Sequence, residues 1–267
     1  MSAVRPFAKT ALVLVLALAP ALLSSPSRAC GVGAPGAPAG VCDASEVLDA
    51  KVAAARRDRF GISYGHTDTV LFFGDGRRAE ATRNAAVLVW EHRVASRWTL
   101  QIGLGSLLGG TVTANVPGGG LTSNFRPGVL GSVGLTHRVF EADGGAVDGK
   151  PFLMTTYTLS FALATTQPSA AAGASEQPTA YSAFDLRLGL ILGTTIARTF
   201  TPYLAARVFG GPIFWTLAGS SVVGTDAYKY EIGGGLAVSL VKNRLALFVD
   251  GSVLGERDVR GGASLAF

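Results

Sequence analysis

The residue pair with the clearest potential for chemistry is His66 and Asp68. A spacing of two puts both side chains on one face of a β-strand, where the carboxylate could orient the imidazole for proton transfer. Strict alternation, however, places the pair on the apolar face of this segment, together with Ile62, Tyr64 and Val70. Because a charge among apolar groups is costly, the pattern favours a bulge or a polar pair at the strand end over a catalytic site.

Other candidates for catalysis or ligand binding are weaker. His92 and His137 lie near the inner ends of their predicted strands with apolar neighbours of the same parity, which is typical of interfacial side chains. The glycine-rich stretches 103–105 and 233–235 do not open a helix, so they do not resemble phosphate-binding loops. With no visible metal-ligand cluster either, the sequence predicts no catalytic residue, no metal and no cofactor.

A larger group of candidates consists of charged residues inside otherwise small or apolar strand segments. They fall on the face opposite the large apolar side chains, so they would point into the interior, or lumen, of a closed sheet. One interpretation is an ion-pair network that fills a narrow lumen. The other is a constriction in a polar pore, with inward glycines such as Gly103 and Gly189 leaving room or marking bends. The expected set is Glu91, Arg93, Arg138, Asp185, Arg187, Arg207, Lys229, Glu231, Asp250 and Arg260.

The elements that must position these charges are long strands with two-residue alternation. Large side chains alternate with small or polar ones, for example over 98–105 and 184–193. Short and long connections then alternate, and 109–127, 164–180 and 216–227 are expected to be the long external loops. The ten predicted strands are 60–73, 84–94, 97–108, 128–140, 151–163, 181–197, 202–215, 228–241, 245–254 and 258–267, with eight or twelve strands still possible.

Composition decides between a soluble sandwich and a membrane barrel. The chain is apolar on average (mean hydropathy +0.37), only 15% charged, and has 35 glycines among 267 residues. The predicted strands are long enough to cross a bilayer, which takes about 9–11 residues per strand. We therefore expect an all-β fold, a transmembrane antiparallel up-and-down β-barrel over residues 60–267.

The N-terminal region predicts export. Residues 1–29 have a basic start, an apolar core and small residues before a cut after Ala29, as in a signal peptide. Residues 30–59 form a periplasmic segment with a short helix predicted over 43–58. Cys30 and Cys42 would form a disulfide, unless Cys30 carries lipid. The mature chain keeps 20 basic and 18 acidic residues, so its charge gives no reason to expect a nucleic-acid partner.

The last strand carries a resemblance to a known class. It ends in Phe267 with Leu265, Ala263 and Val259 at alternate positions before it, and it resembles the C-terminal assembly signal of bacterial outer-membrane β-barrel proteins. The resemblance implies the barrel-assembly machinery and outer-membrane lipid as partners, and the outer membrane as location. Three functions remain open: a structural or surface-interaction protein with a plugged lumen and an unidentified external ligand, a narrow pore for ions or small solutes, or a rim-sited hydrolase.

Overall fold

The computed structural model describes residues 58–95, 97–116, 119–141, 149–169, 177–197, 199–217, 219–241 and 244–267. The predicted signal peptide, Cys30, Cys42 and nearly all of the predicted helix lie outside these residues. No helix in the described ranges is long and apolar enough to span a membrane. The strands are β1 Asp58–Phe73, β2 Arg78–Ala95, β3 Trp98–Val116, β4 Gly119–Phe125, β5 Gly128–Glu141, β6 Gly149–Pro168, β7 Thr179–Ile196, β8 Phe200–Gly210, β9 Ile213–Leu217, β10 Ser220–Asp226, β11 Tyr230–Val241, β12 Leu245–Gly255 and β13 Arg257–Ala266.

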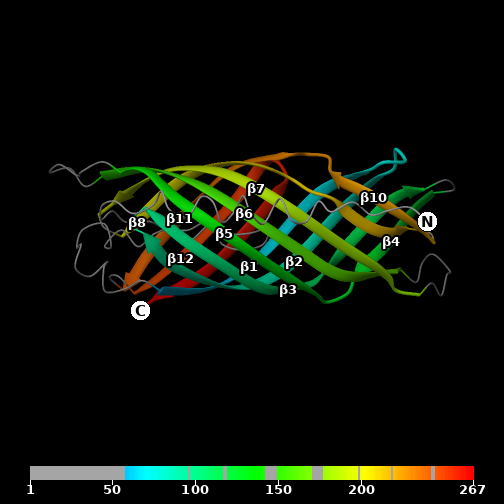
Figure 1. Cartoon of the computed structure of the whole chain (residues 1–267), viewed down its shortest axis with the longest axis horizontal. Coiled ribbons are helices and arrows are strands. Elements are labelled where there is room, and N and C mark those ends of the chain that lie inside the picture. The colour runs from blue at the N-terminus through cyan, green and yellow to red at the C-terminus, as the bar shows by residue number, and fades with distance from the viewer. Residues whose placement is uncertain are drawn as a thin grey trace, which may run out of the picture.

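All strands belong to one antiparallel sheet that closes on itself as an elongated barrel (Figure 1). At the end that holds Asp58 and Phe267, the wall is a ring of ten strands in the order β1, β2, β3, β5, β6, β7, β8, β11, β12, β13. The ring closes where β1 pairs with β13, from Arg59 opposite Ala266 to Asp68 opposite Arg257. We call this part the ten-strand ring, and its strand number confirms the prediction.

Toward the far end the wall narrows to eight strands. The β12–β13 hairpin stops at Glu256, and above it β10 pairs directly with β1. The order there is β1, β2, β3, β4, β6, β7, β9, β10, which we call the eight-strand ring. Three wall strands are interrupted near the junction, at Arg126-Pro127 between β4 and β5, at Gly211-Pro212 between β8 and β9, and at residues 227–229 between β10 and β11. Proline cannot donate to a sheet ladder, which accounts for the first two breaks.

The two rings have opposite polarity. In the ten-strand ring the large apolar side chains point outward, and Ile62, Leu104 and Leu204 are more than half exposed. We call this outer surface the apolar belt. In the eight-strand ring the apolar side chains point inward and form a core that we call the apolar plug. Its members are Leu71, Phe73, Ala79, Ala81, Leu107, Val112, Ala114, Phe125, Tyr181, Ala183, Ile213, Trp215, Leu217 and Val222.

The prediction of three long external loops is wrong. Most of residues 109–127, 164–180 and 216–227 extend the strands into the eight-strand ring. Their outward residues are mainly Thr, Ser, Asn and Gln, such as Thr113 and Asn124, and this composition hid the strands. β7 has 18 residues and rises about 45 Å at an ordinary tilt, well beyond a belt of about 25 Å.

Smaller differences concern strand ends. β1 begins at Asp58, so the predicted helix cannot extend to that residue. At the far tip, the β1–β2 turn needs Gly76, whose φ is 85°. There Arg77 hydrogen-bonds to Asp75 and lowers the pKa of that carboxyl group.

Candidate functional site

The most concentrated polar chemistry lies in the lumen below the apolar plug. Arg187 on β7 is 4% exposed and makes three charge-assisted hydrogen bonds. Its guanidinium donates to Asp185 at 2.6 Å, to Glu231 at 2.8 Å and to Glu256 at 2.8 Å. It also lies over the ring of Phe209, with 4.2 Å between Cζ and the ring centre. Arg187 thereby joins three carboxylates from three parts of the barrel.

Glu231 on β11 is the second centre. It is fully buried, and three arginines surround its carboxylate. Arg187 and Arg207 donate directly, and Arg260 approaches at 3.4 Å. A carboxylate with no exposure stays charged only when such partners compensate for its lost hydration.

The β12–β13 turn supplies the remaining acids. Glu256 is buried at the tip, where Arg83 of β2 lies 3.6 Å from its second oxygen. Asp258 pairs with Arg260. We call the set the lumen network: Arg83, Asp185, Arg187, Arg207, Glu231, Asp250, Glu256, Asp258 and Arg260.

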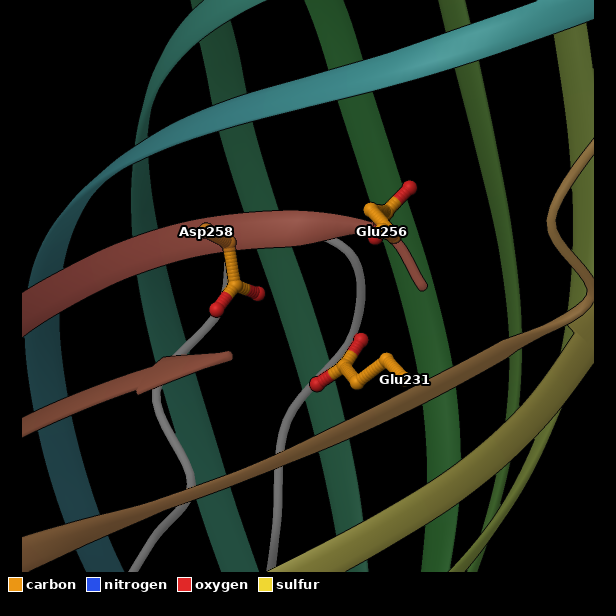
Figure 2. Close-up of side chains that lie close together, drawn as sticks. All are labelled: Glu231, Glu256 and Asp258. Atoms are coloured by element: carbon orange, nitrogen blue, oxygen red, sulfur yellow. The ribbon is translucent and has the colours of Figure 1, made fainter. Parts of the chain in front are cut away.

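A metal site is the obvious alternative for part of this network. Figure 2 shows Glu231, Glu256 and Asp258 converging from the barrel wall and the hairpin, and oxygens from all three lie within 4.8 Å of one another. Arginine guanidinium groups, however, already contact each of these carboxylates. A cation would have to displace them, so the arrangement favours ion pairs.

The structure places most of the sequence-predicted charges inside the barrel, but not all in one site. Six belong to the lumen network: Asp185, Arg187, Arg207, Glu231, Asp250 and Arg260. Glu91 and Arg138 are buried nearer the termini, where Glu91 accepts a hydrogen bond from Gln101 at 2.6 Å, and Arg93 is half-buried.

Lys229 departs from the expectation of a lumen position. It lies in the break between β10 and β11 and is exposed. Alternation fails there because residues 227–229 are not in a strand.

Three network members were missed by sequence reasoning: Arg83, Glu256 and Asp258. Arg83 lies just before the predicted start of its strand, and Glu256 lies in a predicted turn. Asp258 has the parity of Arg260, so alternation alone could have identified it.

Several inward glycines lie against a large side chain: Gly193 against Phe152, Gly235 against Tyr203, and Gly189 against Arg207. At these three positions the space beside the glycine is filled by a neighbour, which weakens the pore interpretation.

A cavity of about 60 Å³ lies between the lumen network and the apolar plug. Arg83, Arg187 and Asp226 contribute to its polar side, and Leu107 and Ile213 to its apolar side. A volume of this size holds about four water molecules.

His66 and Asp68 lie on the outer surface. His66 Nε2 is 3.5 Å from Asp68 Oδ1, and its Nδ1 is 2.8 Å from Asn84 Oδ1. The expected bulge is wrong, because β1 keeps one continuous register with both neighbours. The charge is tolerated because Asp68 accepts a hydrogen bond from the Thr82 hydroxyl at 2.9 Å and lies at the level of the hairpin tip, where the apolar belt ends.

The other two histidines lie close to aromatic rings near the termini. His92 is 2.9 Å from Asp58, and His137 stacks on Trp98 with 4.4 Å between ring centres. Both positions are consistent with interfacial side chains.

Neither a family model nor a curated protein matches this chain. Among solved structures, it is similar to the outer membrane protease OmpT of Escherichia coli, at 9% identity and a TM-score of 0.46 over 79% of this chain and 97% of that one. It is also similar to the outer membrane protein OprG of Pseudomonas aeruginosa (9% identity, TM-score 0.44, 79% and 96% covered). A third is the transport unit of the autotransporter AIDA-I of E. coli (12% identity, TM-score 0.44, 79% and 90% covered).

The geometry of the chain itself carries the assignment. In the closed antiparallel ring each strand is hydrogen-bonded to a neighbour on both edges. An apolar belt surrounds a polar interior. This inside-out arrangement suits lipid outside and polar groups within, which is the pattern of barrels in the bacterial outer membrane. The chain is a transmembrane β-barrel of the bacterial outer membrane.

Proposed function

We propose that this protein is a closed barrel that conducts neither ions nor solutes and acts through the surface of the eight-strand ring. The observation that carries the proposal is the apolar plug. Leu71, Phe73, Val112 and Ala114 are fully buried in it, and Trp215 is 3% exposed. An apolar core of this kind excludes water and hence hydrated ions.

The lumen network supports the proposal as a second closure below the plug. Its charges are paired across the lumen by side chains that are almost fully buried, such as Arg187 and Glu231. Two closures in series mean that loss of one does not open a path.

The orientation follows from the termini. Asp58 and Phe267 are hydrogen-bonded at one end of the barrel, which in barrels of this type faces the periplasm. The eight-strand ring then projects outside the cell. Its outer face carries polar residues such as Thr113, Asn124 and Gln167, which suits contact with water and with an external partner.

The test is conductance of the purified full-length protein in planar lipid bilayers. We expect no stable current from the unmodified protein, and none from Arg187→Ala or Trp215→Ala alone, because each leaves the other closure intact. A stable open current from the unmodified protein would overturn the proposal.

A narrow pore is the second candidate. The cavity of about 60 Å³ between the two closures favours it, since water there would form part of a path if both closures moved. The same conductance measurement decides between the two.

A rim-sited hydrolase is the third candidate, and its basis is the pair of His66 and Asp68 on the outer surface. Lipid and peptide hydrolysis by the unmodified protein and by His66→Ala would test it, and equal rates would exclude this pair.

A further inference from the structure

A second polar feature lies on the outside of the barrel, at the junction of the two rings. The β12–β13 hairpin ends there, and residues 227–229 cross above its tip. Ala227 donates its backbone N–H to Val70 on one side, at 2.7 Å, and Glu256 donates to Tyr230 on the other, at 3.2 Å. These two bonds bring the break between β10 and β11 directly against the hairpin tip.

Two exposed cations occupy this place. Arg257 is the first residue of β13, and Lys229 is the last residue of the break. Neither takes part in an ion pair within the ranges that the structure describes. The arginines of the lumen network are paired with carboxylates, so Lys229 and Arg257 differ from them in having charge available for a ligand.

The surroundings define the depth of the two cations in the membrane. Directly below them the apolar belt reaches its upper edge, where Val253 is 75% and Val259 is 62% exposed. Tyr228 and Tyr230, which flank Lys229, are 44% and 47% exposed. Exposed tyrosines beside the end of an apolar belt are typical of the headgroup level.

We propose that Lys229 and Arg257 bind the phosphate of a glycolipid headgroup in the outer leaflet. Arginine offers a planar pair of donors to phosphate oxygens, and lysine adds a point charge. Asp68 lies opposite Arg257 in the β1–β13 pairing and adds a negative charge to the site. Because this charge repels a phosphate, binding by both cations is favoured over binding by Arg257 alone. This inference rests on the orientation given under the proposed function.

The test is binding of lipid A, a phosphorylated disaccharide lipid, to the full-length protein in detergent, measured by native mass spectrometry. Dephosphorylated lipid A and inorganic phosphate are the comparison probes. The Lys229→Ala/Arg257→Ala double variant removes both cations. Its matched control, Arg78→Ala/Arg244→Ala, removes two exposed cations away from the junction, one near the β1–β2 turn and one at the end that holds Phe267.

We expect lipid A affinity to fall about 25-fold in the first double variant, since each cation near a lipid surface contributes roughly a fivefold change. The control should stay within about twofold, and dephosphorylated lipid should bind all proteins alike. Equal losses in both double variants, or no loss in either, would overturn the proposal. So would inorganic phosphate that binds as tightly as lipid A, because the ligand would then be a free anion. Conductance does not enter this measurement, so its outcome is separate from the test of closure.

Discussion

Replacement of Arg187 by methionine tests whether the lumen network stabilises the barrel. Methionine keeps much of the side-chain volume but removes a guanidinium that makes bonds of 2.6, 2.8 and 2.8 Å to three carboxylates. Within the lumen network, five carboxylates then face three guanidinium groups instead of four. Breaking a buried ion pair on one side costs about 3–5 kcal/mol, and the upper part of this range applies because three acids lose a partner.

The measurement is urea unfolding of the full-length protein in lipid vesicles, followed by tryptophan fluorescence. Glu80→Gln is the matched control, because it changes one charge on the exposed face of β2 and should shift the free energy of unfolding by less than about 0.5 kcal/mol. The double variant Arg187→Met/Glu256→Gln should recover part of the loss, since one orphaned carboxylate is removed with the arginine. A cost for Arg187→Met as small as that of Glu80→Gln would refute the view that these ion pairs hold the wall together.

Three further outcomes are expected. Trp215→Ala should lower the free energy of unfolding by about 3–5 kcal/mol, measured by urea unfolding, because it hollows the apolar plug and removes the bond from the indole N–H to Thr166. Gly255→Ala should slow or prevent barrel closure, followed by the mobility shift of folded barrel on unheated gels, because φ is 82° and a Cβ would collide with the carbonyl oxygen of Tyr230. A cysteine at Thr113 should react in intact cells with a membrane-impermeant maleimide, whereas a cysteine at Leu104 should not, and the reverse result would contradict the division into belt and projecting ring.

Alternation allowed the ten-strand ring to be predicted because both faces of a lipid-spanning strand carry a signal. Over 184–193, for example, large apolar residues alternate with small or charged ones, and the structure has a strand there. The eight-strand ring gave a weaker signal. Around Thr113 and Asn124, apolar residues are shorter and fewer, and glycine and threonine are typical of loops as well as of exposed strand faces.

The lumen network could be predicted in part for a related reason. Parity identifies the inward face of a strand, so Arg187 and Glu231 were found from their neighbours alone. Parity says nothing where a strand is broken, and two of the four errors lie at such places. Lys229 was assigned inward across the break, and Glu256 was left in a turn although the turn points into the barrel.

The position of the lumen network follows from the change in strand number. The β12–β13 hairpin ends partway up the barrel, and β10 must bend across to reach β1. The wall at this level lacks the side chains that two further strands would supply, and the hairpin tip cannot be held by pairing above it. Glu256 holds the tip instead, because its carboxylate forms ion pairs with Arg187 of β7 and Arg83 of β2. The ion pairs therefore connect opposite parts of the wall at the level where the backbone ladder between them is interrupted.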